Sequence, residues 1–529
     1  MPAGRSGVSR FFIHLAALLL GAVLFAAAFP NLFIGKGAAF LGWIAFVPVF
    51  WLISRVGLGA SVFWGALYGY AAYGLFNYWL SVFHPLAGLI VGAIYLVYFA
   101  LFFPLLKLAV LLFPRRGYIL QWILWIAYAY LRTQGFLGYP YGIAGYSQWS
   151  LPPLIQIASL FGVWGVSALV VFPSAYLAAA LAAGKAKTFF SRERLPGLLW
   201  LGALGGTLVF GFLSPVDYSQ APAARIALVQ HNTDPWRGDL EDYRRNYEVL
   251  KRLSLEALDA RPRPDLVVWS ETAFVPRIYW HTTYRDDPQS YVLVKELLDF
   301  LKLQDVPFVI GNDDARKELN ENGLWERVDY NAVMLFDRGE IAALYRKLHL
   351  VPFTEHFPYE KQLPWVYQAL LNADTHFWKT GDEATVFEIG GLKFSTPICF
   401  EDTFGYLSRD FVRNGAEIIV NLSNDAWSKS LPAQMQHLSM AVFRAVENRR
   451  SLVRSTASGQ TCGVDPNGRI LAMAEPFVET QLTLEVPVVK TTSFYTQAGD
   501  FLPLVFIIAG GILLIGGLIL HIAHHKKRP

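Results

Sequence analysis

The residues best suited to covalent chemistry in this chain are Cys399 and two charged side chains that also follow predicted strands. Cys399 lies between a strand predicted over 391–395 and a helix predicted over 403–414. Such an elbow exposes a side chain above a sheet and directs backbone N–H groups at a bound molecule. With only two cysteines, the chain has no disulfide framework. Taken alone, Cys399 could equally be a small buried hydrophobe, as most free cysteines are.

Two other stretches place a carboxylate and a cation where they could act on this thiol. Residues 265–271 form an apolar predicted strand that ends at Glu271, and residues 341–347 form one that ends at Lys347. A thiol becomes a nucleophile when a cation lowers its pKa or a base removes its proton. Taken singly, both residues are ordinary solvated charges at strand ends. Three such groups can, however, converge on one edge of a sheet.

Three motifs give the chain a resemblance to a known family. Glu271 lies in WSETAF, Lys347 in YRKLHLVPFTEHFP and Cys399 in ICFED. The order of Glu, Lys and Cys resembles that of the nitrilase superfamily. The particular sequences of these motifs, with hydrophobic spans on both sides of them, resemble the apolipoprotein N-acyltransferases within that superfamily. The resemblance covers nearly the whole chain. It implies that Cys399 is the nucleophile, Glu271 the general base and Lys347 the oxyanion-stabilising cation, aided by a backbone N–H near Phe400.

The same resemblance implies supporting residues. Glu355 would hold Lys347 charged and oriented. Glu401 matches a family residue, although it could equally cap the following helix. Trp236 corresponds to a functional tryptophan after the first strand. Asn331 would support the site, unless it is a turn or strand-edge amide.

The chain also departs from the family pattern. Phe400 replaces the tyrosine that commonly follows the cysteine, so a hydroxyl group is absent there. The Asn-Asp-Ala-Trp run at 424–427 continues as Ser428-Lys429-Ser430 instead of an aromatic-Gly pair, which puts the shape of this loop in doubt. We interpret Cys462 as structural.

The composition indicates a membrane protein, because 54% of the 529 residues are hydrophobic. A span requires about 20 largely apolar residues. The first predicted span is not followed by the small-residue cleavage site of a signal peptide, so we expect it to be retained. The predicted spans are 11–30, 37–54, 59–83, 86–113, 117–133, 159–183, 196–214 and 500–522.

The charges that flank these spans predict the orientation of the chain. The flanks on the side of the N-terminus carry twelve Lys and Arg residues, whereas the opposite short loops carry only Lys36 and Arg132. The positive-inside rule therefore places both termini in the cytoplasm. It predicts a membrane domain over 1–214, a periplasmic domain over 215–499 and a final span with a basic tail over 500–529 of a bacterial inner-membrane protein.

The region 215–499 is predicted to be a layered α/β domain, because helices and strands alternate early and strands cluster late. The family resemblance makes it a nitrilase-like α-β-β-α sandwich. We expect a charged loop over 313–326. An aromatic stretch over 353–377 is either a lid, a membrane-dipping arm or a loop packed on its own domain. Residues 134–158 are interpreted as a re-entrant or interfacial segment, and a lipid headgroup is considered near His84, Arg132 and Tyr139–Tyr146.

The predicted activity is transfer of an acyl chain to the α-amino group of a diacylglyceryl-cysteine at the N-terminus of a lipoprotein. The resemblance implies a phospholipid donor, most simply phosphatidylethanolamine, and a monomeric enzyme without a cofactor. The scattered histidines show no metal-ligand spacing, and a net charge of +4 does not suggest a nucleic-acid partner. The alternatives are a membrane-tethered amidase or lipase, and a transporter or scaffold with an inactive nitrilase domain. The intact triad argues against the scaffold.

The charge count predicts which side of the membrane each loop faces. A thiol reagent that cannot cross the inner membrane should label a cysteine introduced near Asn320 and leave one near Lys187 unlabelled. Mass spectrometry of the labelled protein from intact cells measures both positions. Labelling near Lys187 from outside would show that the spans are miscounted.

Overall fold

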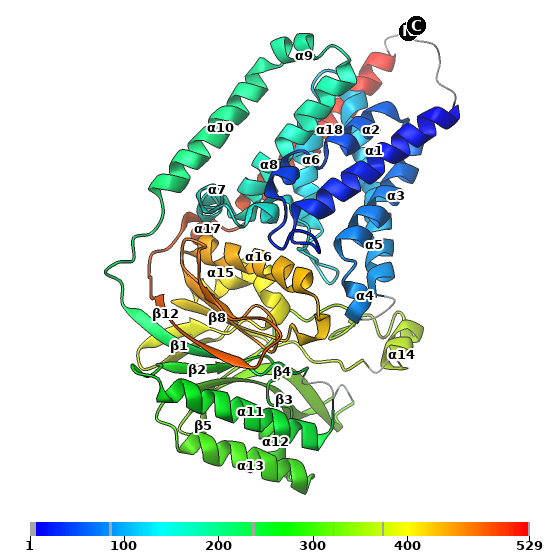
Figure 1. Cartoon of the computed structure of the whole chain (residues 1–529). Helices are drawn as coiled ribbons and strands as arrows, with labels where there is room; N and C mark the ends of the chain where they lie inside the picture. Colours follow the sequence, from blue (N-terminus) through cyan, green and yellow to red (C-terminus); the bar gives the residue numbers. More distant parts are fainter. Residues whose placement is uncertain (1–6, 84–86, 235–237, 321, 373–374, 527–529) are drawn as a thin grey trace. The chain divides into compact units, whose positions relative to one another are not determined.

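The computed structural model describes residues 7–83, 87–234, 238–320, 322–372 and 375–526, and its elements are labelled in Figure 1. The chain forms two compact units. Unit 1 comprises Met1–Pro215, Ser430–Ser439 and Ala498–Pro529, and unit 2 comprises Val216–Lys429 and Met440–Gln497. The predicted site residues Trp236 and, for the lipid headgroup, His84 lie outside the described residues.

Unit 1 is helical. Five of its described helices, α1, α5, α8, α10 and α18, are long and apolar enough to cross a membrane, and two further apolar stretches, Ala39–Arg55 and Gly117–Leu131, are shorter. Its helices are α1 (Gly7–Ala28), η1 (Ala39–Trp43), α2 (Val47–Arg55), α3 (Leu58–Phe76), α4 (Leu80–Phe83), α5 (Ala87–Leu112), α6 (Gly117–Leu131), η2 (Ala144–Gln148), α7 (Pro152–Ile155), α8 (Ala158–Ala183), α9 (Ala186–Arg192), α10 (Arg194–Leu213) and α18 (Phe501–Lys526).

Two of the stretches predicted as continuous spans are interrupted. Residues 37–54 divide into η1 and α2, and residues 59–83 divide into α3 and α4. The second break occurs at Asn77, whose side-chain amide donates to the carbonyl of Tyr73 at 3.0 Å and so terminates α3. A polar side chain that bonds to a carbonyl of the preceding turn competes with continuation of the helix.

Helices α3 and α5 pack closely because α3 carries two glycines one turn apart. A Cβ on Gly65 would lie 2.2 Å from the carbonyl oxygen of Phe99, and a Cβ on Gly69 would lie 2.1 Å from that of Tyr95. Both distances are far shorter than any allowed contact. Small residues at this spacing let two membrane helices approach, so that dispersion forces hold them together.

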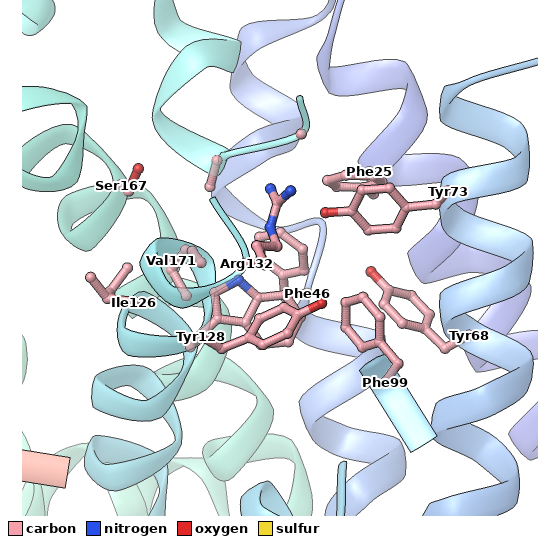
Figure 2. A pocket seen from close by; sticks show the side chains of 14 residues that line it. Phe25, Phe46, Tyr68, Tyr73, Phe99, Ile126, Tyr128, Arg132, Ser167 and Val171 are labelled. Atoms are coloured by element: carbon pink, nitrogen blue, oxygen red, sulfur yellow. The ribbon is translucent and has the colours of Figure 1, made fainter. Parts of the chain in front are cut away.

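The predicted segment around Arg132 is buried inside unit 1. The guanidinium of Arg132 donates to the hydroxyl of Tyr95 at 2.7 Å and to the carbonyl of Tyr139 at 2.6 Å. Figure 2 shows Arg132 among the rings of Tyr73, Tyr128 and other aromatic residues. The cavity there measures about 10 Å³, room for about one water molecule. The donors of Arg132 are thus directed at protein groups.

The first part of helix α16 (Leu431–Asn448) belongs to unit 1 and the rest to unit 2. Within unit 1, the side chain of Gln436 donates to the carbonyl of Pro30 at 3.0 Å and to that of Phe76 at 3.3 Å, and accepts from the indole of Trp79 at 3.0 Å. One amide from a distant part of the sequence therefore joins the ends of α1 and α3.

Unit 2 contains two sheets of six strands each. The first has the order β12-β1-β2-β3-β4-β5 and the second β11-β10-β9-β8-β7-β6. The strands of the first sheet are β1 (Ala223–Gln230), β2 (Leu266–Trp269), β3 (Phe308–Leu319), β4 (Trp325–Asp337), β5 (Glu340–Arg346) and β12 (Thr480–Pro487). Those of the second are β6 (Val386–Ile389), β7 (Leu392–Ser395), β8 (Ile418–Ser423), β9 (Ser451–Thr456), β10 (Cys462–Val464) and β11 (Ile470–Met473).

The two sheets share one pattern of strand directions. In the first, β1, β2 and β3 are parallel and are flanked by the antiparallel strands β12 and β4. In the second, β7, β8 and β9 are parallel and are flanked by the antiparallel strands β6 and β10. The sheets pack together, with the hydroxyl of Ser455 donating to the carbonyl of Val268 at 3.0 Å.

Helices cover the outer face of each sheet, which gives the α-β-β-α order that the resemblance implied (Figure 1). On the first sheet, α11 (Leu240–Asp259) and α13 (Pro288–Lys302) bury leucines against β1, β2 and β3. On the second lie α15 (Gly405–Arg413) and the part of α16 from Met440 onward. The remaining helices of unit 2 are α12 (Ile278–Tyr284), α14 (Pro364–Asn372), η3 (Cys399–Thr403), η4 (Ala426–Ser428) and α17 (Phe494–Ala498).

One local prediction was wrong. Residues 313–326 are not a loop but the ends of the hairpin formed by β3 and β4, whose charges are paired in place of apolar packing. Glu318, for example, bonds to Lys379 at 2.6 Å and to the hydroxyl of Tyr330 at 2.6 Å. The helix predicted over 403–414 corresponds to α15, and the tighter turn η3 precedes it and begins at Cys399 itself. The aromatic stretch 353–377 contains α14, where Trp365 is 72% exposed.

The close contact between α3 and α5 predicts that a methyl group added at each of two glycines of α3 destabilises the protein. Replacing Gly65 and Gly69 together by alanine should lower the midpoint of thermal unfolding by several degrees, since overpacking costs about 1–3 kcal/mol per site. Gly74→Ala is the matched control, because it lies in the same helix and its Cβ would meet no atom within 4 Å. Thermal unfolding of the detergent-solubilised protein measures the difference. Equal midpoints for the double variant and the control would contradict the close packing.

Candidate active site

The carboxylate of Glu271 follows β2 and is held by donors from both sheets. Its Oε1 accepts from the side-chain amide of Asn331 at 2.9 Å, and its Oε2 accepts from the backbone N–H of Asn424 at 2.8 Å. Glu271 is only 5% exposed. The neighbouring Gly311 allows this chain segment to approach β3, because a Cβ there would lie 2.4 Å from the carbonyl oxygen of Ser270.

Lys347 follows β5 and lies between two carboxylates. Its Nζ is 2.8 Å from Oε1 of Glu355 and 3.4 Å from Oε1 of Glu271, and the side chain is fully buried. The other oxygen of Glu355 accepts from the backbone N–H of Val351 at 2.9 Å. This bond closes the turn that brings Glu355 back onto Lys347.

These neighbours determine the protonation of Lys347. Burial lowers the pKa of its ammonium group, but the charges of Glu355 and Glu271 outweigh that effect and hold the pKa above its usual value. Lys347 therefore remains a cation in a dry site. For Glu355, burial raises the pKa, and the nearby charge of Lys347 offsets this only in part.

Cys399 occupies a strained elbow between β7 and η3. Its φ angle is +49°, in the left-handed region that non-glycine residues rarely adopt. The side-chain amide of Asn421 donates to the carbonyls of Pro397 at 3.1 Å and Cys399 at 3.3 Å, which secures both sides of the elbow. Backbone strain of this kind is concentrated at functional sites and turns a side chain out of the regular strand.

The thiol of Cys399 is in electrostatic contact with both charged members of the predicted triad. Burial raises its pKa well above the ordinary value, and the Glu271 carboxylate raises it further, while Lys347 lowers it. The resting side chain is therefore a thiol and not a thiolate. A base would have to remove this proton before the sulfur could act as a nucleophile, and Glu271 is the carboxylate with the largest effect on the thiol.

Glu401 joins the Lys347 segment to the Cys399 elbow. One oxygen accepts from the backbone N–H groups of Leu348 at 2.7 Å and His349 at 3.0 Å, and the other accepts from that of Ile398 at 2.7 Å. The hydroxyl of Tyr345 donates to both oxygens, at 2.8 and 2.9 Å. Burial raises the pKa of Glu401 to about 7. The bond to Ile398 is the cap that the sequence suggested; the other bonds were not foreseen.

A buried ionic group behind the elbow was missed in the sequence. Arg454 of β9 forms ion pairs with Asp402 and with Asp425, the latter at 3.4 Å, and it is fully buried. Asp425 also accepts from the hydroxyl of Ser423 at 3.0 Å, and a hydrogen bond from the Ser423 side chain acts on the thiol of Cys399. The only signal in the sequence was the pairing of acidic residues after two strands with an arginine inside a third.

The remaining predicted residues have simpler surroundings. Phe400 is buried, with its ring edge-on to Phe404 at a centroid distance of 5.0 Å. In the loop of altered sequence, Ala426–Ser428 form a single 3-10 turn and Lys429 adopts a φ of +42°. Cys462 is fully buried in β10, and burial raises its pKa to about 12.

This geometry brings a thiol, a carboxylate and a fixed positive charge into one site. That combination suits acyl transfer, in which a tetrahedral intermediate gains a negative oxygen. Among the described residues, no group of three or more His, Cys, Asp or Glu side chains is arranged to hold a metal ion.

Comparison with known proteins agrees with this chemistry. The carbon-nitrogen hydrolase family matches residues 225–495, and the apolipoprotein N-acyltransferase N-terminal domain matches residues 21–180. The chain is 47% identical to apolipoprotein N-acyltransferase 1 of Treponema denticola, over 93% of this chain and 94% of that protein. The chain belongs to the apolipoprotein N-acyltransferase family. The enzyme is therefore an N-acyltransferase that combines an apolar helical part with a nitrilase-like α/β part.

Other apolipoprotein N-acyltransferases are similar over comparable lengths. The chain is 46% identical to apolipoprotein N-acyltransferase 1 of Treponema pallidum, over 99% of this chain and 98% of that protein. Among solved structures, an amidase from Nesterenkonia sp. AN1 is 19% identical, with a TM-score of 0.36, and covers 54% of this chain and 96% of its own.

The position of Glu271 predicts opposite effects of one substitution on two reactions of Cys399. In Glu271→Gln, loss of the negative charge lowers the thiol pKa, so alkylation by iodoacetamide at pH 8 should become roughly 3- to 10-fold faster. Formation of an acyl-enzyme should become slower by roughly 100-fold or more, because the base is lost. Peptide mass spectrometry at residue 399 measures both rates.

Two controls accompany this experiment. Cys399→Ser should take up no iodoacetamide, because Cys462 is buried and has a raised pKa. In the unsubstituted protein, alkylation should keep increasing with pH beyond pH 9, since the thiol pKa is raised. Slower alkylation in Glu271→Gln than in the unsubstituted protein would show that the carboxylate activates the resting thiol instead of opposing its ionisation.

Proposed function

We propose that this enzyme transfers an acyl chain from a phospholipid, through a thioester on Cys399, to the α-amino group of an N-terminal S-diacylglyceryl-cysteine. The acceptor is an apolipoprotein, and the reaction is the last step of bacterial lipoprotein maturation. The observation that carries the proposal is the 47% identity to an apolipoprotein N-acyltransferase over 93% of the chain. The buried group of Cys399, Glu271 and Lys347 supplies the chemistry.

In the first step, Glu271 takes the proton of the Cys399 thiol as the sulfur attacks the ester carbonyl of the phospholipid. The new oxyanion is stabilised by the ammonium of Lys347 and by a backbone N–H near Phe400. The intermediate collapses when the carbon–oxygen bond of the ester breaks. Glu271 returns the proton to the departing lysophospholipid, and a thioester remains on the enzyme.

In the second step, the free α-amino group of the lipoprotein attacks the thioester carbonyl, and Glu271 removes a proton from the attacking nitrogen. Lys347 again stabilises the negative oxygen. The carbon–sulfur bond then breaks, and the proton on Glu271 returns to the sulfur of Cys399. The products are an amide on the lipoprotein and an enzyme restored to its resting thiol, so no cofactor is consumed.

Glu355 supports both steps as a positioning residue. Its 2.8 Å ion pair opposes the tendency of a buried ammonium to lose its proton, and its bond to Val351 fixes the direction of that pair. A neutral amine could not stabilise the oxyanion. Glu401 acts indirectly, because it binds the backbone next to Lys347 and next to Cys399 and so fixes the positions of both residues.

Several finer assignments belong to the same proposal. Phosphatidylethanolamine is the donor, the enzyme is a monomer, and it resides in the bacterial inner membrane with residues 215–499 in the periplasm. The twelve cationic residues that flank one side of the predicted spans support the orientation of the chain in this membrane. Both substrates carry hydrocarbon chains, which is consistent with a catalytic unit tethered by apolar helices.

A hydrolase is the second candidate, because the carbon-nitrogen hydrolase family matches residues 225–495. In that case water would replace the lipoprotein amine in the second step. The two functions differ in what happens when phosphatidylethanolamine is supplied without a peptide acceptor. A transferase stops after one turnover with the acyl group on the enzyme, whereas a hydrolase releases fatty acid continuously.

The test is mass spectrometry of the purified full-length enzyme after incubation with phosphatidylethanolamine alone. We expect the mass of one acyl chain on the peptide that contains Cys399, together with one equivalent of lysophospholipid. Cys399→Ser should abolish the adduct, and the matched Cys462→Ser should retain it. An adduct on Cys462, or steady release of fatty acid without any adduct, would contradict the proposal.

A further inference from the structure

The end of unit 1 that carries the basic flanks contains a second cavity, of about 450 Å³. It lies where the ends of α2, α5, α6 and α8 meet α9. Its volume is within the range of small-molecule binding sites. None of the residues assigned to the acyl-transfer chemistry lines it.

The lining of this cavity is strongly cationic. It includes Arg55, Arg115, Lys185 and Arg192, and Glu193 is its only acidic member. In the part of the chain that the structure describes, no acidic side chain pairs with Arg55, Lys185 or Arg192. The guanidinium of Arg55 instead donates to the carbonyl of Ala182 at 3.1 Å, which fixes its position at the rim.

The single carboxylate is already neutralised. Glu193 is 1% exposed and accepts from Nε of Arg115 at 2.7 Å and Nε of Arg116 at 3.0 Å. The hydroxyl of Tyr118 donates to it at 3.2 Å. Glu193 therefore pairs with one lining arginine, Arg115, and with Arg116 outside the lining, and does not cancel the charges of Arg55, Lys185 and Arg192. The cavity therefore carries a net positive charge, and its one carboxylate is already paired with protein groups.

Apolar groups form the other part of the lining. Helix α8 contributes four alanines, Ala178, Ala179, Ala182 and Ala183, and phenylalanines at positions 50 and 189 complete this face. The short alanine side chains leave the space that longer residues would fill. A cationic rim beside an apolar wall matches a molecule with a negative headgroup and a hydrocarbon tail, because arginine binds phosphate oxygens through strong charge-assisted bonds.

We propose that this cavity binds the phosphate headgroup of an anionic phospholipid, with the first part of an acyl chain against the alanines of α8. The proposed site is separate from the acyl donor and acceptor sites of the reaction. Phosphate recognition alone would also fit free inorganic phosphate, and the apolar wall is the observation that favours the lipid. The bound lipid would secure α9 against the ends of α2 and α8.

Native mass spectrometry of the full-length protein in detergent tests the proposal, with dioleoyl phosphatidylglycerol and dioleoyl phosphatidylcholine as probes. The variant Arg55→Gln/Arg192→Gln removes two lining cations. The matched variant Arg10→Gln/Arg194→Gln removes two cations that do not line the cavity. Phosphatidylglycerol should be retained at least about tenfold less by the lining variant, the scale expected for two lost cations, and equally by the matched one.

Further arms of the experiment identify the source of the phosphate. Ala179→Leu keeps every cation but narrows the apolar wall, so it should weaken phosphatidylglycerol binding, and 10 mM inorganic phosphate should not displace the lipid. Retention of phosphatidylglycerol and phosphatidylcholine to the same extent would overturn the proposal, as would equal losses in both double variants. Full displacement by inorganic phosphate, with Ala179→Leu unaffected, would assign the cavity to free phosphate and overturn it too.

N-acylation of a lipopeptide by each variant provides the control for folding. Because the lining residues take no part in the acyl transfer, the variant Arg55→Gln/Arg192→Gln should acylate at a rate within about twofold of the unsubstituted enzyme when assayed in detergent. Loss of lipid binding with retained activity supports a separate lipid site. Parallel loss of binding and activity in all variants, including the matched one, would count against it, since the effect would then be general.

Discussion

The architecture of the active site depends on the hydrogen bonds of one buried carboxylate, that of Glu401. It accepts three backbone N–H groups, two from the segment after Lys347 and one from the segment before Cys399, besides the hydroxyl of Tyr345. A buried charge without partners would cost several kcal/mol, so these donors must stay in place for the fold to be stable. Lys347 and Cys399 follow strands of two different sheets, and Glu401 sets their relative position.

Burial and the neighbouring charges then determine the protonation state of each group at the site. Two carboxylates keep Lys347 charged, while burial and Glu271 keep the Cys399 thiol protonated. In the resting enzyme Lys347 is thus held as a cation, whereas Cys399 is held as a thiol. A thiol of this kind is protected from oxidation and from chance alkylation, because the thiolate is the reactive form. It gains reactivity only when a base takes its proton.

The sequence allowed good prediction of features that depend on local pattern. Apolar strands ending in Glu271 and Lys347, and the elbow at Cys399, can be recognised because strand ends and turns are encoded over a few residues. The hairpin of β3 and β4 was mistaken for a loop because its outer halves are charged and are stabilised by ion pairs with residues far along the chain, such as Lys379 with Glu318. The bonds of Glu401 and the Arg454 group were missed for the same reason: their partners meet only in the folded protein.

The division of helix α16 between the units bears on how the enzyme is made. Unit 1 is assembled from three separate stretches of chain, and Gln436, whose side chain joins the ends of α1 and α3, is synthesised 406 residues after Pro30. The helical unit can therefore not be complete when its own N-terminal helices leave the ribosome. The carbonyls of Pro30 and Phe76 gain this partner only after most of the α/β unit has been synthesised. Completion of the helical unit therefore depends on synthesis of the α/β unit, and no single cut of the chain between residues 215 and 498 would leave all of unit 1 in one fragment.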